Sequence, residues 1–253
     1  MIDLKGKTAL VTGASRGIGR ACAVMLAACG ANVAVNFLSS RQGAAQTVQQ
    51  VQSHGVQGLA LRADVASAEE MRAAVDLVTE RFGRLDIIIS NAAAGGFRPL
   101  LEVTPANWEG ILRTNAAPLL WLAQAAAPVM QANGGGKIVA ISSHGSFRAV
   151  SNYGAIGASK AALESLVRHL ALELGPTGIQ INCVLAGMVA TEAIQSMPRH
   201  AEILQQSRDL MLVRDRELTP QHIAQVVTFL ASPLSDAIQG QTLIADGGVS
   251  IRV

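Results

Sequence analysis

The hydrophobic residues of this chain gather in short, mostly uninterrupted runs separated by longer amphipathic segments. Runs of this kind are typical of strands that are buried on both faces of a parallel sheet. The segments between them are rich in alanine, and their apolar residues recur at helical spacing. The pattern predicts seven strands, at residues 8–11, 32–37, 58–65, 85–91, 137–143, 179–185 and 241–248.

Alternation of strands and helices along the whole chain predicts an α/β fold of the Rossmann type. We expect a doubly wound, parallel, seven-stranded sheet with helices on both faces. Because no Pro/Ser-rich linker or repeat divides the sequence, residues 1–253 should form a single domain. Residues 188–216 mix polar and apolar positions with weak strand signals, which favours a small lid over the substrate. A pair of amphipathic surface helices is the alternative for this segment.

Composition and charge exclude several other classes of protein. Half of the residues are hydrophobic and the net charge is only +2, which is too small to indicate a nucleic acid partner. Residues 1–7 lack the hydrophobic region of a signal peptide. The apolar stretch 116–130 is short and interrupted by proline, so no membrane span is expected. The three cysteines form no CxxC pair, which favours buried thiols, no metal site and a cytoplasmic location.

A glycine-rich turn follows the first strand, at residues 12–19, and leads into a predicted helix. Gly13 can adopt a positive φ, Gly17 allows the backbone to approach a pyrophosphate, and Gly19 permits close packing of helix on strand. The free N–H groups at the start of the helix would then bind the phosphates. The turn predicts cofactor contacts from Gly13, Ser15, Arg16, Gly17, Ile18 and Gly19.

The residues after the second strand indicate which dinucleotide is bound. An NAD site usually places Asp or Glu there, whereas residues 36–41 contain no acid. Arg16 and Arg41 can reach a 2′-phosphate, and Ser39 or Ser40 can donate a hydroxyl. NADP(H) is therefore the expected cofactor. For Arg41 alone, a solvated arginine at the start of a helix is the competing interpretation.

Residues 12–19, Asn91, Asn115, Ser143 and Lys160 stand in the order and at the intervals of one known family. Along nearly its whole length the chain resembles the short-chain dehydrogenases/reductases. The resemblance implies that Asn115 holds a water in the proton relay and that the protein is a homotetramer. It also implies further cofactor contacts from Asp64, Val65, Asn91, Lys160, Gly187, Val189 and Thr191.

The tyrosine of the expected active site stands at an unusual position. Ser143 precedes Lys160 by 17 residues, as in common members of the family, but Tyr153 precedes it by seven. The commoner arrangement has tyrosine four positions before the lysine, where this chain has Ile156. A shift of three residues keeps nearly the same helical face and moves the side chain roughly 4.5 Å, provided that the helix includes Tyr153.

The resemblance assigns a role to each of these side chains. Tyr153 would stabilise and protonate the substrate, while Lys160 would bind the ribose and lower the tyrosine pKa by its charge. We expect Ser143 to have lost its partner, because the tyrosine has moved, and its role in the site is left open. His144 could donate to substrate, although a structural histidine is the more common case.

Chemistry supplies a reason for the shift. When a ketone is reduced, charge develops on the oxygen of the carbon that receives hydride. When a 2-enoyl thioester is reduced, hydride goes to the β-carbon and charge develops on the more distant thioester oxygen. A donor placed for one oxygen is poorly placed for the other.

Residues 142–193 resemble the NADPH-dependent enoyl-acyl-carrier-protein reductases of the third type. The sequence therefore predicts an NADPH-dependent reductase of enoyl thioesters carried on acyl carrier protein or coenzyme A. Arg199, Arg208, Arg214 and Arg216 could meet an acidic carrier protein, although scattered surface arginines are common.

Two other functions stay open at this point. One is a carbonyl reductase in which Tyr153 has been repositioned around a ketone substrate. The other is a regulator that binds NADP without turnover. The retention of Lys160, Ser143 and a tyrosine argues against the regulator.

Overall fold

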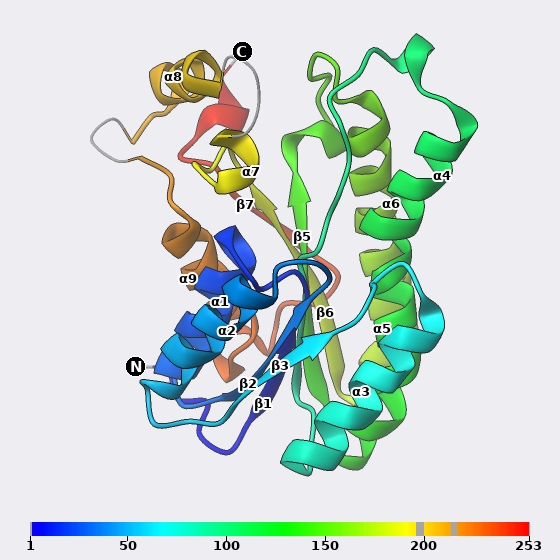
Figure 1. The fold of residues 1–253 in the computed structure, drawn as a ribbon, viewed down its shortest axis with the longest axis vertical. Helices are drawn as coiled ribbons and strands as arrows, with labels where there is room; N and C mark the ends of the chain where they lie inside the picture. The colour runs from blue at the N-terminus through cyan, green and yellow to red at the C-terminus, as the bar shows by residue number, and fades with distance from the viewer. Residues whose placement is uncertain (1, 196–199, 214–216, 253) are drawn as a thin grey trace.

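The sheet of the computed structural model has seven parallel strands in the order β3-β2-β1-β4-β5-β6-β7 (Figure 1). The structure describes residues 2–195, 200–213 and 217–252. The strands are β1 (Thr8–Val11), β2 (Asn32–Phe37), β3 (Gly58–Arg62), β4 (Ile87–Ser90), β5 (Gly136–Ser143), β6 (Ile179–Ala186) and β7 (Thr242–Ala245). This order confirms the predicted Rossmann-type fold, and it places the reversal of strand order between β1 and β4, where such sheets bind ligands.

Helices cover both faces of the sheet, with α1, α2 and α9 on one side and α3, α5 and α6 on the other (Figure 1). The helices are α1 (Gly17–Ala28), α2 (Arg41–Gln52), α3 (Ala68–Phe82), α4 (Pro105–Asn115), α5 (Ala117–Ala132), α6 (Gly154–Leu174), α7 (Glu192–Gln195), α8 (His200–Leu210) and α9 (Pro220–Leu230). Short 3-10 turns are η1 (Leu100–Glu102), η2 (His144–Ser146), η3 (Gly175–Thr177), η4 (Pro233–Ser235) and η5 (Val249–Ile251).

The five central strands, β2, β1, β4, β5 and β6, each contribute to two hydrophobic cores. In β1, Ala9 and Val11 belong to the core beneath α1 and α9, while Leu10 belongs to the core beneath α3 and α5. Successive side chains of a strand point to opposite faces, so a strand covered on both sides must be apolar at every position. This is the physical reason for the uninterrupted hydrophobic runs.

Several predicted strands end earlier in the structure than in the sequence analysis. The third ends at Arg62, before Asp64, and the fourth ends at Ser90, before Asn91. The seventh ends at Ala245, because Gly247 and Gly248 adopt positive φ angles that leave the strand conformation. Asp64, Asn91 and Asp246 therefore lie in the loops at the carboxyl edge of the sheet.

The segment predicted as a lid contains α7 and α8, while residues 196–199 and 214–216 lie outside the described residues. The chain after α8 packs on the C-terminal turn, where the Leu212 N–H donates to the Gly247 carbonyl at 2.9 Å. Arg208 pairs with Glu217 at 2.5 Å on the surface. Arg199, Arg214 and Arg216, the other members of the predicted basic face, lie outside the described residues. Closure of this segment over a substrate stays a prediction.

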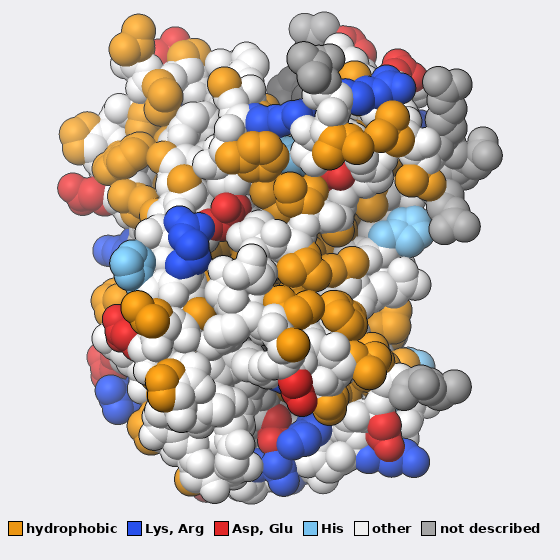
Figure 2. All heavy atoms as spheres, turned by 180° about the vertical axis from the view of Figure 1, so that it is seen from behind, with side chains coloured by type: hydrophobic (Ala, Val, Ile, Leu, Met, Phe, Trp, Pro, Cys, Tyr) orange, Lys and Arg blue, Asp and Glu red, His pale blue; other side chains and the backbone are white. Residues whose placement is uncertain are grey.

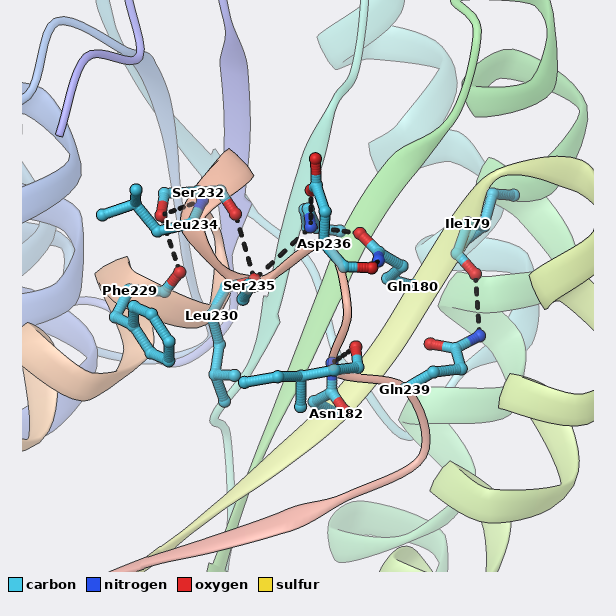
Figure 3. A network of polar contacts seen from close by, with 12 residues as sticks. Ile179, Gln180, Asn182, Phe229, Leu230, Ser232, Leu234, Ser235, Asp236 and Gln239 are labelled. Atoms are coloured by element: carbon cyan, nitrogen blue, oxygen red, sulfur yellow. Dashed lines mark hydrogen bonds and ion pairs between the residues drawn. The ribbon is translucent and has the colours of Figure 1, made fainter.

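A polar network anchors the segment that leads from α9 into β7 (Figure 3). Asn182 of β6 donates to the Ile238 carbonyl at 2.8 Å, and Gln239 donates to the Ile179 carbonyl at 3.2 Å. Gln180 donates to the Asp236 carbonyl beside them. These bonds hold the edge strand β7 against β6 and so position the turn that follows it.

None of the described helices combines the length and the apolar character that crossing a membrane would require.

Candidate active site

A cleft of about 470 Å³ opens at the carboxyl edge of the sheet, where the strand order reverses. The predicted cofactor residues that line it are Gly13, Ser15, Arg16, Gly17, Ile18, Gly19, Asp64, Val65, Asn91 and Thr191. Gly13 and Gly17 adopt φ angles of +61° and +57°, which other residues rarely tolerate. A Cβ on Gly19 would lie 2.5 Å from both the Gly13 carbonyl and the Asn91 amide. The tight turn therefore depends on its glycines.

Asn91 ties together the two strands that flank the reversal. Its backbone N–H donates to Thr12 Oγ1 at 2.9 Å, and its side-chain amide donates to the Thr12 carbonyl at 2.8 Å. Because Thr12 follows β1 and Asn91 follows β4, these bonds hold the cleft's two walls in register.

Asn36 lines the cleft where an NAD-preferring site would carry an acid. Its side chain accepts from the Gly13 N–H at 3.2 Å and donates to the Ala63 carbonyl at 3.0 Å. An amide can make both bonds, whereas an ionised carboxylate has no donor. Sequence reasoning noted the missing acid but did not find this role of Asn36.

Arg16 stands at the mouth of the cleft and faces Glu192 across it. Their closest side-chain atoms are 3.8 Å apart, and both side chains are more than half exposed. An ion pair this exposed contributes little stability, so a phosphate could displace Glu192 from the guanidinium.

The remaining predicted cofactor residues do not line this cleft. Ser39, Ser40 and Arg41 are exposed at the start of α2, where the Ser40 hydroxyl accepts from the Gly43 N–H at 3.3 Å as a helix cap. Val189 is 3% exposed within the core, and the Gly187 N–H donates to the Ala245 carbonyl at 3.0 Å. Lys160 does not line the cleft either, and direct contact of these six residues with a cofactor stays a prediction.

Tyr153 and Ser143 are brought together by the turn that precedes α6. Their hydroxyl oxygens are 2.9 Å apart, so the expectation that Ser143 had lost its partner is wrong. The helix begins at Gly154 and Tyr153 is its N-cap, so the tyrosine is not displaced along a continuous helix as the sequence arithmetic assumed. Asn152, with a φ of +59°, turns the chain just before it.

Two glycines make room for the tyrosine ring. A Cβ on Gly145 would lie 2.4 Å from the ring atom Cδ1 of Tyr153. A Cβ on Gly157 would lie 2.5 Å from the Gly145 carbonyl, so α6 and η2 can approach only because both residues are glycine. Phe97 packs on the other side, with ring centroids 5.2 Å apart. None of these three residues was predicted from the sequence. Only Gly145, a glycine two residues after Ser143, could have indicated close packing at this point.

Ile156 occupies the position at which relatives more commonly carry the tyrosine. It is 7% exposed and packs with Ile111 and Ala155 in a small apolar cluster. Its side chain also contacts the loop after β4, where a Cβ on Gly95 would lie 2.7 Å from Ile156 Cγ1. This position therefore serves packing in the present chain.

Lys160 lies buried beneath the tyrosine loop, with 6% of its surface exposed. Its ammonium donates to the Ile141 carbonyl at 2.7 Å. Burial lowers the pKa of Lys160 to about 8, although Cys183 and Glu164 act in the opposite direction.

The pKa of Tyr153 is shifted upward by burial, and the hydrogen bond with Ser143 only partly opposes the shift. Lys160 is not among the causes of this shift, so a lowering of the tyrosine pKa by Lys160 stays a prediction. A tyrosine that keeps its proton is suited to donate a hydrogen bond to an oxygen on which negative charge develops.

Asn115 ends α4 and joins three parts of the site. Its side-chain oxygen accepts from the Ala94 N–H at 2.8 Å, and its amide donates to Ser159 Oγ at 3.0 Å. It thereby ties the loop after β4 to α6 and holds it near Lys160. A water relay through Asn115 stays a prediction.

His144 pairs with Asp246 at 2.8 Å, which favours the structural interpretation of this histidine. Burial tends to raise the pKa of Asp246, but hydrogen bonds from Ser250, His144 and Gly248 outweigh it and lower the pKa. The carboxylate thus links the residue after Ser143 to the C-terminal turn.

Comparison with known proteins decides the family. A family model described as "Enoyl-(Acyl carrier protein) reductase" matches residues 13–250. The chain belongs to the short-chain dehydrogenase/reductase family. It is 39% identical to 1-cyclohexenylcarbonyl-CoA reductase of Streptomyces collinus, over 97% of this chain and 87% of that protein.

Two solved structures of short-chain dehydrogenases/reductases have the same fold. A 7α-hydroxysteroid dehydrogenase in complex with NADH and 7-oxo glycochenodeoxycholic acid superposes with a TM-score of 0.91, at 35% identity over 97% of this chain and 95% of the other. A short-chain dehydrogenase from Burkholderia cenocepacia in complex with NADP gives a TM-score of 0.87, at 35% identity over 98% and 99% of the chains.

The protein is therefore an oxidoreductase of this family that uses a nicotinamide dinucleotide. The cleft fits such a cofactor, because the positive-φ glycines leave open backbone where a side chain would meet the pyrophosphate. When bound, the nicotinamide supplies the hydride. Among the described residues, no group of three or more His, Cys, Asp or Glu side chains could hold a metal ion.

Proposed function

We propose that the protein reduces 2-enoyl thioesters to saturated acyl thioesters with NADPH. The observation that carries the proposal is the placement of Tyr153 at the N-cap of α6, with Ile156 filling the usual tyrosine position. We propose that the phenol in this position serves an oxygen that lies away from the carbon receiving hydride.

Each side chain then has a defined task. Tyr153 donates a hydrogen bond to the thioester oxygen, where negative charge develops as hydride reaches the β-carbon. Ser143 orients the phenol through the 2.9 Å hydrogen bond. Lys160 provides positive charge beneath the site and binds the ribose of the cofactor. A proton taken up at the α-carbon completes the saturated product.

The surroundings of Tyr153 favour an apolar acyl group. Phe97, Leu100, Phe147 and Val150 are large hydrophobic residues that remain between 38% and 58% exposed on the loops flanking the tyrosine. Figure 2, a view from behind, shows hydrophobic side chains gathered over the upper half of the molecule. Such exposed apolar surface is typical of a binding site.

The comparisons support the same class of substrate. The Streptomyces relative is named for the reduction of 1-cyclohexenylcarbonyl-CoA, which is an unsaturated thioester, and the matching family model is named for enoyl reductases. We propose coenzyme A or acyl carrier protein as the thiol carrier. A cytoplasmic homotetramer is the form in which we expect the enzyme to work.

A carbonyl reductase is the second candidate, and one observation favours it. Ser143 and Tyr153 are hydrogen-bonded above a buried Lys160, so their hydroxyls could both serve a ketone oxygen. The 7α-hydroxysteroid dehydrogenase of the same fold was solved with a 7-oxo steroid.

NADPH oxidation assays with crotonyl and acetoacetyl thioesters separate the candidates. Crotonyl turnover that is lost in Tyr153→Phe would support enoyl reduction, and the coenzyme A and carrier-linked forms should be compared. Acetoacetyl turnover without crotonyl turnover would establish the carbonyl reductase instead. If the protein binds NADPH but turns over neither thioester, the NADP-binding regulator is the function that remains.

A further inference from the structure

Glu164 places a carboxylate behind Lys160, outside the cofactor cleft. The two residues are four apart on α6, which is the spacing at which side chains on one helix face become neighbours. Both reach the end of β5, since Lys160 donates to the Ile141 carbonyl at 2.7 Å and Ser142 Oγ donates to Glu164 Oε1 at 2.5 Å. Glu164 is half-buried, so its charge is only partly screened by solvent.

The ammonium of Lys160 needs such a charge. A buried cation without compensation is costly, and the Ile141 carbonyl supplies only a dipole. Besides Glu164, Cys183 on β6 acts on this ammonium, and Tyr153 stands immediately before α6. Tyr153 keeps its proton, and burial raises the pKa of the Cys183 thiol to about 12, so both are neutral at physiological pH. Glu164 supplies the carboxylate of this cluster.

We propose that Glu164 is a positioning residue whose carboxylate, anchored by Ser142, keeps Lys160 in its ammonium form despite burial. The proposal rests on Lys160 working at the cofactor. It does not depend on whether the substrate is an enoyl thioester or a ketone.

The direction of the effect follows from the charges. Burial lowers the pKa of Lys160, and the Glu164 carboxylate raises it. Removal of the carboxylate lets the lysine lose its proton at a lower pH, by about one pH unit for a partly buried neighbouring charge. Because NADPH binding depends on the ammonium, its affinity should begin to fall at a lower pH in the variant than in wild type.

NADPH affinity between about pH 7 and pH 10, measured by the fluorescence of the bound dinucleotide, tests this without any substrate. In wild type, the Kd should rise as Lys160 deprotonates. In Glu164→Gln the rise should begin about one pH unit lower. Ser142→Ala should shift it in the same direction by less, because the carboxylate remains but is no longer held.

Glu173→Gln is the matched control. It removes the same charge from the exposed side of α6, more than two turns away, and should leave the curve unchanged. The Gln side chain keeps the shape of Glu164 and can still accept from Ser142, and an unchanged Tm would show that Glu164→Gln is folded.

Superimposed curves for wild type and Glu164→Gln would overturn the proposal, as would an equal shift in Glu173→Gln or a Kd independent of pH in every variant. If crotonyl thioester is not turned over but the pH dependence of the NADPH Kd shifts as predicted, only the proposed enoyl reduction is contradicted.

Discussion

Tyr153 and Ser143 share a hydrogen bond of 2.9 Å although the tyrosine stands three residues earlier than in the commoner family arrangement. The pairing survives because the tyrosine precedes the helix as its N-cap. A turn through Asn152 brings the ring back over Gly145. The family's serine–tyrosine contact is thus retained, while the backbone that carries the phenol is different.

Substitution of Tyr153 by phenylalanine should abolish most turnover. The change keeps the ring packed against Phe97 but removes the hydroxyl that stabilises the developing charge. We expect kcat to fall by at least about 100-fold, with NADPH affinity nearly unchanged. Stopped-flow reduction of crotonyl thioester would measure this, and a variant that retained wild-type kcat would exclude Tyr153 from the chemistry.

Gly145→Ala should displace the tyrosine. Its new methyl group would meet the Tyr153 ring at 2.4 Å, so ring or loop must move. We expect a loss of about 1–3 kcal/mol in the free energy of unfolding and a lower kcat. Gly96→Ala is the control, because a Cβ at Gly96 has nothing within 4 Å. Urea unfolding and turnover of both variants would check the prediction, and equal behaviour of the two would contradict it.

The ion pair at the cleft mouth predicts two opposite effects on cofactor use. Arg16→Ala should raise the KM for NADPH by about 10-fold or more and change that for NADH little, because a charge-assisted phosphate contact is lost. Glu192→Gln should lower the KM for NADPH, since it frees Arg16 from its partner at 3.8 Å. Steady-state kinetics with both dinucleotides would test this. A wild-type preference for NADH would show that the NADP(H) prediction is wrong.

The buried lysine predicts a pH effect on stability. The pKa of Lys160 is about 8 in the folded protein and 10.5 for an ordinary lysine, so between these values the unfolded chain binds the extra proton. Stability attributable to this group therefore rises with pH across that window. The free energy of unfolding of wild type relative to Lys160→Met should increase from about pH 8 towards 10. A difference that stayed constant or fell across this range would show that burial does not lower the pKa of Lys160.

The sheet, the glycine-rich turn and the order of the residues along the site could all be predicted from the amino-acid sequence. Strands buried on both faces require unbroken apolar runs, and a turn with positive φ at Gly13 and Gly17 requires glycine. Both requirements are local, so they can be read from neighbouring residues. Strand ends do not follow from neighbouring residues alone, because Asn91 leaves the sheet through a hydrogen bond with the distant Thr12.

Which side chains contact one another depends on the packing of the folded chain. The contact of Tyr153 with Ser143, the space left by Gly145 and Gly157, and the bond from Ser142 to Glu164 all depend on how α6 packs against the end of β5. A shift by one helical turn required the helix to include Tyr153, whereas the helix begins one residue later. Burial, which raises the pKa of the tyrosine and lowers that of the lysine, also arises from this packing and has no counterpart in residue spacing.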